Sequence, residues 1–213
     1  MYSCLLFDLD GTLTDPGLGI TNSVMYALQK FGITVENRAS LYPFIGPPLR
    51  ESFERYYGFS PEQSAQALAF YREYFRDRGL YENEVYDGVA PLLGELKAQG
   101  KTLFVATSKP ETFAVEILRH FRLDGYFDFI AGATMDESRN KKGDVIRYAL
   151  AQGAVSDPAT AVMIGDREQD VRGAQECGLD SIGVLYGYGS REELTAAGAT
   201  YLAATPQDLL RYV

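Results

Sequence analysis

The stretch Asp8-Leu9-Asp10-Gly11-Thr12 decides the fold, because it follows the apolar run of residues 4–7, Cys-Leu-Leu-Phe, and so places two carboxylates where a buried strand ends. If the strand continues that far, Asp8 and Asp10 point to the same face, since strand side chains alternate. Two neighbouring acids are tolerable as anions only beside a cation, either a metal or a basic side chain. The stretch therefore predicts a site with a counter-charge, and the alternative is an Asp-Gly turn that merely ends a strand.

The length of the chain limits the number of domains it can form, and its charge limits the classes of molecule it can bind. At 213 residues it can form one large domain, or a core with an insertion, and bury a sizeable apolar interior either way. The formal net charge is −9 and the sequence pI is about 4.7. Binding along a phosphate backbone needs clustered Lys and Arg, so we expect no nucleic-acid polymer as a partner.

The cysteine content and the hydropathy pattern predict the cellular location of the protein. Only Cys4 and Cys177 occur, which is too few for a disulfide framework or a zinc site. The N-terminal residues lack the pattern of a secretion signal, and no run of about 18 apolar residues is present. We expect a cytoplasmic protein without a membrane partner.

The hydrophobic periodicity changes along the chain. Residues 20–31, 48–57 and 61–78 carry apolar and aromatic side chains at helical spacing. From Gly88 onward, helical segments alternate with short apolar runs at residues 103–106, 127–131, 161–164 and 181–185. Such alternation predicts an α/β fold with an open, parallel, Rossmann-like sheet and crossover helices.

The two patterns predict two domains. Residues 1–14 and 87–213 form the α/β core, and residues 15–86 form an all-α cap domain inserted directly after the Asp pair. Short connections at both ends of the insertion would let the cap move as a lid over whatever the acids bind.

Polar residues follow the predicted strands where a ligand is expected. In open parallel sheets, ligands bind beyond the carboxyl ends of the strands. Thr107, Ser108 and Lys109 follow one strand, Asp166 and Asp170 follow another, and Lys141 and Lys142 open a helix after a third. Hydroxyl and ammonium donors suit phosphate oxygens, while carboxylates suit a hard cation, so these residues predict a phosphate site with a metal.

These residues resemble a known family. The elements Asp8-x-Asp10-Gly11-Thr12, Thr107-Ser108, Lys142 and Gly165-Asp166-x-x-x-Asp170 are similar to the four motifs of the haloacid dehalogenase-like phosphatases. The helical insertion resembles the cap of the phosphoglycolate phosphatase and β-phosphoglucomutase branch. Residues 44–50 and 183–190 resemble the bacterial 5′-nucleotidase and phosphoglycolate phosphatase subgroup.

The resemblance implies roles for the strand-end acids. Asp8 would attack phosphorus to form an aspartyl-phosphate that water then hydrolyses. Asp10 would protonate the leaving alcohol and later deprotonate the water. Mg²⁺ would bind the Asp8 side chain, the Asp10 backbone carbonyl and Asp166, with Asp170 either a direct ligand or the holder of a bound water.

The resemblance also implies the phosphate and specificity residues. Gly11, Thr12, Thr107, Ser108 and Lys142 would bind the phosphate. Lys142 is preferred over its neighbour Lys141 because it stands directly before residues 143–146, Gly-Asp-Val-Ile, as in the family. Lys109 faces either substrate or solvent, and Gly46 and Arg50 lie in the expected specificity loop of the cap.

The function implied by these features is that of a Mg²⁺-dependent phosphatase, monomeric or homodimeric, whose substrate is a small phosphorylated metabolite. A small cap closing over the site favours a compact phosphomonoester, either a nucleoside monophosphate or phosphoglycolate. A phosphomutase or pyrophosphatase of the same superfamily is the alternative. A receiver-like module of phosphate signalling is the non-enzyme alternative, because it also uses a strand-end Asp, a divalent cation, Thr and Lys.

Overall fold

The computed structural model describes residues 2–213, and their contacts divide the chain into two units. Unit 1 comprises the N-terminal residues up to Thr14 together with Val85–Val213, and unit 2 comprises Asp15–Glu84. The chain leaves unit 1 in the short strand β2 (Thr14–Asp15) and returns in β3 (Glu84–Val85), and these two strands pair. The sequence pattern did not reveal this pair, because two residues are too few to show a period.

Unit 1 is built on a six-stranded sheet in the order β5-β4-β1-β6-β7-β8, and every adjacent pair is parallel. The strands are β1 (Cys4–Phe7), β4 (Thr102–Pro110), β5 (Phe129–Ala133), β6 (Ala161–Gly165), β7 (Asp180–Val184) and β8 (Tyr201–Ala203). The α/β prediction is confirmed. Sequence analysis missed only β8, a three-residue strand at the edge of this sheet.

The sheet register brings the functional strand ends together. The central strand β1 pairs with β4 on one side and β6 on the other, and Phe7 lies opposite both Val105 and Ile164. All four residues of β1 are buried, as expected for a strand covered on both faces. The residues that follow these three strands therefore meet at one edge of the sheet.

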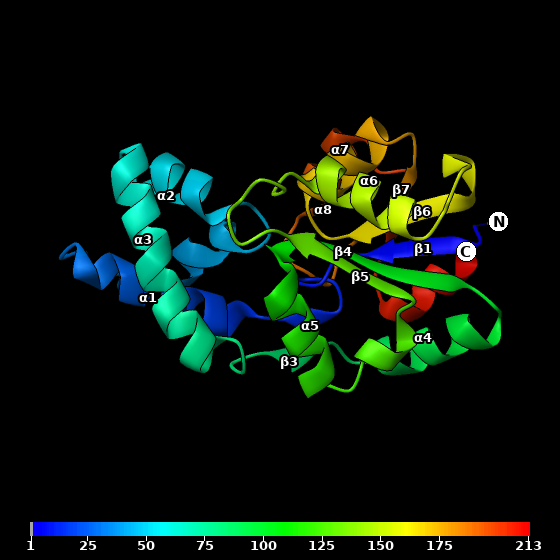
Figure 1. The fold of residues 1–213 in the computed structure, drawn as a ribbon, viewed down its shortest axis with the longest axis horizontal. Coiled ribbons are helices and arrows are strands. Elements are labelled where there is room, and N and C mark those ends of the chain that lie inside the picture. The colour runs from blue at the N-terminus through cyan, green and yellow to red at the C-terminus, as the bar shows by residue number, and fades with distance from the viewer. Residues whose placement is uncertain (1) are drawn as a thin grey trace. The chain divides into compact units, whose positions relative to one another are not determined.

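Helices cover both faces of the sheet in unit 1, with α6 and α7 on one face and α4 and α5 on the other (Figure 1). The helices are α4 (Val89–Ala98), α5 (Glu111–His120), α6 (Lys142–Gln152), α7 (Glu168–Glu176) and α8 (Arg191–Ala197). Short 3₁₀ turns occupy Asp124–Tyr126, Pro158–Thr160 and Pro206–Arg211. The functionally important point is that α6 and α7 both begin at the edge where β1 and β6 end.

Unit 2 is helical, as predicted. It contains α1 (Gly17–Lys30), a 3₁₀ segment (Arg38–Phe44), α2 (Leu49–Tyr57), α3 (Pro61–Tyr74) and one π-helical turn (Phe75–Gly79) that continues α3. Helix α3 begins with a capping box in which Ser60 and Gln63 satisfy each other's backbone N–H groups. Phe44, Phe53 and Phe59 pack together, so much of the aromatic content of this unit forms its core.

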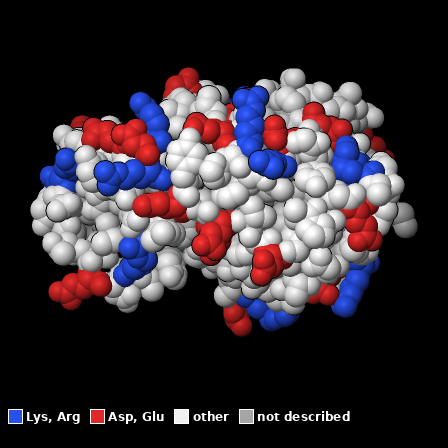
Figure 2. Space-filling view, turned by 90° about the horizontal axis from the view of Figure 1, so that it is seen from below, with Lys and Arg blue, Asp and Glu red and all other residues white. Residues whose placement is uncertain are grey.

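Charged side chains of both signs are interspersed over the face drawn in Figure 2, without one large basic patch on that face. Within residues 2–213, no helix combines the length and apolar character needed to cross a membrane.

Candidate active site

Asp8 stands immediately after β1, and its backbone N–H donates to Ile164 O at 2.8 Å. The strand does not continue through Asp10, so the condition for strand alternation is not met: β1 ends at Phe7 and a tight turn follows. In this turn Gly11 N donates to Thr14 O at 2.8 Å and Leu13 N donates to Leu9 O at 2.9 Å. Asp8 and Asp10 are therefore both buried at the site through a turn, and strand alternation is not the cause.

Gly11 makes this turn possible for two reasons. Its φ of +82° lies in the left-handed region, which glycine adopts without the steric cost of a side chain. A Cβ atom at this position would also collide with the carboxylate of Asp166. Asp10 and Gly11 thus form a turn, but this turn does more than end a strand, because it places the backbone of Gly11 next to the carboxylate of Asp166.

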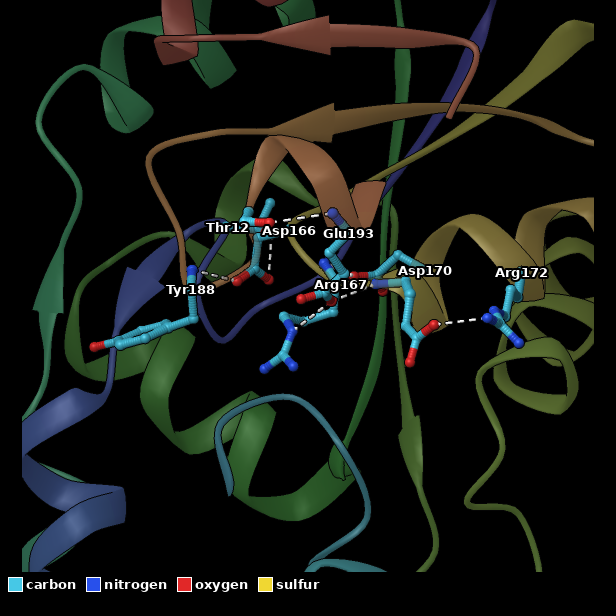
Figure 3. A network of polar contacts seen from close by, with 9 residues as sticks. Thr12, Asp166, Arg167, Asp170, Arg172, Tyr188 and Glu193 are labelled. Atoms are coloured by element: carbon cyan, nitrogen blue, oxygen red, sulfur yellow. Dashed lines mark hydrogen bonds and ion pairs between the residues drawn. The ribbon is translucent and has the colours of Figure 1, made fainter. Parts of the chain in front are cut away.

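Three buried acids form a cluster. One carboxylate oxygen of each of Asp8, Asp166 and Asp170 lies within 4.8 Å of the other two. Asp166 Oδ2 accepts from Tyr188 N at 2.7 Å and Asp166 Oδ1 lies 3.5 Å from Thr12 Oγ1 (Figure 3). These contacts fix Asp166 while leaving its carboxylate facing the other acids.

Asp170 is fixed by the start of α7. Arg167 precedes this helix, and its backbone N–H donates to Asp170 Oδ2 at 3.0 Å (Figure 3). The Arg167 side chain is held in turn by Glu193 of α8, with Nε 2.9 Å from Oε1. The opposite charges of Arg167 and Glu193 offset each other, so this pair adds no net charge beside the cluster.

Lys142 at the start of α6 reaches into the acid cluster. Its Nζ lies 2.9 Å from Asp8 Oδ1 and 2.8 Å from Asp170 Oδ1, and it donates to Ala106 O at 3.0 Å. Lys142 is buried whereas Lys141 is exposed. Of the two adjacent lysines, the structure places only Lys142 among the acids.

Lys109 pairs with the fourth acid. Its Nζ lies 2.7 Å from Asp10 Oδ2, and the side chains of both residues are buried. The sequence left Lys109 facing either substrate or solvent, and the structure excludes solvent. Lys109 is the residue of this site to which sequence reasoning assigned no role, because spacing alone does not show which lysine turns inward.

The other residues singled out by sequence lie as follows. Thr107 is buried at the same edge and its Oγ1 accepts from Lys109 N at 3.2 Å, while Ser108 is half-buried. Gly46 and Arg50 belong to unit 2, where Arg50 lies in the first turn of α2 and donates to Pro61 O at 3.2 Å. Their role in specificity stays a prediction.

Sequence reasoning also missed the loop that supports Asp166. Tyr188 N is its hydrogen-bond donor, and Gly187 and Gly189 flank this residue. A Cβ at Gly187 would collide with Gly11 O and the Asp166 side chain, and one at Gly189 with Asp166 O. The signal was the Gly-x-Gly pattern after β7, which here permits the close approach of this loop to Gly11 and Asp166.

Burial and mutual repulsion disfavour the ionised forms of three of the acids, Asp10, Asp166 and Asp170. Burial, together with the charges of Asp170 and Asp8, raises the pKa of Asp166 well above its usual value. Burial raises the pKa of Asp170 to about 6, although Lys142 opposes this shift. Burial also raises the pKa of Asp10, against the opposing effect of Lys109. For Lys142, burial lowers the pKa, but the carboxylates of Asp170 and Asp8 outweigh it and raise the pKa overall.

The donor set fits a hard divalent cation. The site contains four acids, Asp8, Asp10, Asp166 and Asp170. Within residues 2–213, the ion pairs of these acids involve two ammonium groups, those of Lys109 and Lys142. Four carboxylates and two ammonium groups leave a formal excess of two negative charges. Mg²⁺ carries two positive charges and prefers carboxylate, carbonyl and water oxygens. The clustered oxygens of Asp8, Asp166 and Asp170 therefore suit this ion in both charge and ligand type.

Comparison with known proteins agrees with this geometry. Residues 5–184 match the family model described as haloacid dehalogenase-like hydrolase. The chain is 48% identical to a 5′-nucleotidase of Pseudomonas aeruginosa over 95% of this chain and 91% of that protein. It is 41% identical to the tyrosine-protein kinase PtkA of Mycobacterium tuberculosis over 96% of this chain and 70% of that protein.

A solved structure shares the whole fold. The crystal structure of a predicted phosphatase from Clostridium acetobutylicum superimposes with a TM-score of 0.97 at 51% identity, covering 99% of this chain and 97% of that one. With the strand-end acids, the buried lysine and the parallel sheet in place, the chain belongs to the haloacid dehalogenase-like hydrolases and is an enzyme of the phosphatase type.

Proposed function

We propose that the protein is a Mg²⁺-dependent phosphatase that hydrolyses a small phosphomonoester through a phosphorylated Asp8. One observation carries the proposal: the Lys142 ammonium group lies between Asp8 and Asp170, at 2.9 and 2.8 Å, with Asp166 completing a buried acid cluster. A fixed ammonium group beside the Asp8 carboxylate orients the oxygen that attacks phosphorus and favours the approach of a negatively charged phosphoryl group.

The first chemical step forms a bond between an Asp8 oxygen and phosphorus while the bond from phosphorus to the leaving alcohol oxygen breaks. Lys142 orients the Asp8 carboxylate, and its ammonium group is within reach of phosphoryl oxygens placed at Asp8. Thr107, buried at the same edge, adds a hydroxyl donor. Bound Mg²⁺, held by Asp8, Asp166 and Asp170, would offset the negative charge of the phosphoryl group.

Asp10 provides the proton transfers in this proposal. Burial raises its pKa, so a protonated form is accessible for donation to the leaving oxygen. After the alcohol departs, the Asp10 carboxylate takes a proton from water as that water attacks phosphorus. The phosphorus–Asp8 bond then breaks, which releases inorganic phosphate and restores both acids.

The favoured substrate class is the nucleoside 5′-monophosphates, with phosphoglycolate as the second choice. The support is the P. aeruginosa 5′-nucleotidase, which is 48% identical across nearly the whole of both chains. The net charge of −9 makes long polyanions poor ligands. A compact phosphomonoester is therefore the substrate that best fits both the family and the charge.

Release of inorganic phosphate from a substrate panel tests the proposal. The panel contains the 5′-monophosphates of adenosine, guanosine, cytidine and uridine, then phosphoglycolate, pyrophosphate and sugar phosphates, each with Mg²⁺ or with EDTA. We expect multiple turnovers on at least one monoester with Mg²⁺ and none with EDTA. D8N should abolish release, and D10N should slow one or both steps, while both variants keep the fold by circular dichroism.

The same assay separates the alternatives. A single stoichiometric phosphorylation without release would favour the receiver-like module, and transfer between sugar hydroxyls would favour a phosphomutase. Because one relative is named a tyrosine-protein kinase, the products are also examined for phosphotyrosine. Wild-type turnover in D8N would refute the assigned nucleophile.

A further inference from the structure

Lys109 is a buried lysine whose position is set by an irregularity in β4. Ala106 of β4 lies opposite Ala131 of β5, yet Pro110 lies opposite Ala133, so β4 accommodates two extra residues between these pairs. The extra chain carries Thr107, Ser108 and Lys109 away from regular pairing. Bulges of this kind redirect side chains, and here the Lys109 ammonium group turns towards Asp10.

The contact divides the two oxygens of Asp10 into different environments. Oδ2 lies 2.7 Å from Lys109 Nζ, whereas Oδ1 is buried and has no hydrogen-bond partner among residues 2–213. A buried carboxylate oxygen without a partner is costly unless a ligand satisfies it. The ion pair thus fixes one oxygen and leaves the other available.

Another buried lysine shows what a purely structural role looks like. Lys101, just before the other end of β4, is as buried as Lys109, and its Nζ donates to the backbone O of Tyr2 at 2.8 Å. That contact joins two backbone segments and involves no acid of the site. Lys109 differs because its partner is the side chain assigned to proton transfer.

We infer that Lys109 is a positioning residue, which holds Asp10 Oδ2 so that Asp10 Oδ1 faces the leaving oxygen of the substrate. The inference rests on the proposed phosphatase function and adds a residue outside its four motifs. Rotation about the Asp10 side chain would move the proton donor away from the leaving oxygen, and a buried ammonium group at 2.7 Å opposes that rotation. Lys109 touches Asp10 and needs no contact with substrate.

The leaving group provides the test. Asp10 assists departure of an alcohol far more than departure of p-nitrophenolate, which is a stable anion without a proton. For K109M we expect kcat/KM to fall about 100-fold with a nucleoside monophosphate and clearly less with p-nitrophenyl phosphate, since general acid catalysis contributes about 10²–10⁴-fold. K101M is the matched control, and its kcat/KM values should stay near those of the wild type below its unfolding temperature.

A double-mutant cycle shows whether Lys109 acts through Asp10. Because D10N already removes the proton donor, D10N/K109M should be no slower than D10N. This comparison also serves if K109M itself fails to fold, because the double variant leaves no unpaired buried carboxylate at residue 10. A further loss in the double variant, or equal losses for both leaving groups in K109M, would overturn the inference.

The outcomes distinguish this inference from the proposed function. An inactive wild type, or an active D8N, refutes the phosphatase mechanism and the role of Lys109 with it. An active wild type, an inactive D8N and a K109M variant that behaves like K101M leave the mechanism standing and refute only the positioning role.

Discussion

Replacing Lys142 with Met removes the cation from the acid cluster while retaining a side chain of similar length. The ammonium group lies 2.9 Å from Asp8 Oδ1 and 2.8 Å from Asp170 Oδ1, and both acids are at most 3% exposed. Its loss leaves these carboxylates beside Asp166 without their cation. Because breaking a buried ion pair from one side costs about 3–5 kcal/mol, we expect the free energy of unfolding of unit 1 to fall by that amount.

Urea denaturation of the metal-free protein measures this loss, and a thermal melt provides a second reading. A protein of this size shifts its Tm by about 2–4 °C per kcal/mol, so the melting temperature of K142M should fall by about 6–20 °C. Lys141→Met is the matched control, since Lys141 is the neighbouring but exposed lysine, and its effect should stay within about 0.5 kcal/mol.

The assay is decisive because the two variants change the same residue type at adjacent positions. Mg²⁺ should recover part of the stability lost in K142M, since a divalent cation offsets the same unpaired carboxylates. If K142M is destabilised no more than K141M, the buried ion pairs do not hold this site together, and the electrostatic account of the cluster is refuted.

Three further predictions concern the metal, the pH and the turn. Mg²⁺ at 100 times its Kd should stabilise the native protein by about 2.7 kcal/mol, which corresponds to about 5–11 °C in a thermal melt, and the absence of any shift would argue against the site. In EDTA, the urea midpoint should fall as the pH rises through about 6. The reason is that the pKa of Asp170 is about 6 in the native protein, above its value in the unfolded chain. The stability that protonated Asp170 contributes is therefore full below the unfolded-state pKa and is lost as the pH rises through the native-state pKa. A midpoint that rises over this range would contradict the assignment. Gly11→Ala should lower the free energy of unfolding, measured by urea denaturation, by more than about 2 kcal/mol, because the new Cβ meets Asp166. Gly100→Ala is the control: Gly100 also has a positive φ, +77°, but open space around it, so this change should cost only about 1 kcal/mol. Equal losses would show that the contact with Asp166 is unimportant.

The local sequence determined the element types and their order. Alternating apolar runs and helical segments predicted the parallel sheet, because burial on both faces requires continuous apolar strands and crossovers require helices between them. The short strands β2, β3 and β8 escaped prediction, since two or three residues carry too little periodicity to be recognised. The motif residues were visible because the carboxyl ends of parallel strands are where polar residues converge.

Tertiary structure alone decided how those residues face one another. The turn that follows Phe7, and not strand alternation, buries Asp8 and Asp10 together, and a shift of register in β4 turns Lys109 inward. Lys141 and Lys142 are equivalent as residue types, but only the start of α6 directs one of them to Asp8 and Asp170. Charge and spacing are local properties of a sequence, whereas the partner of a buried charge depends on which distant segments the fold brings within about 3 Å of it.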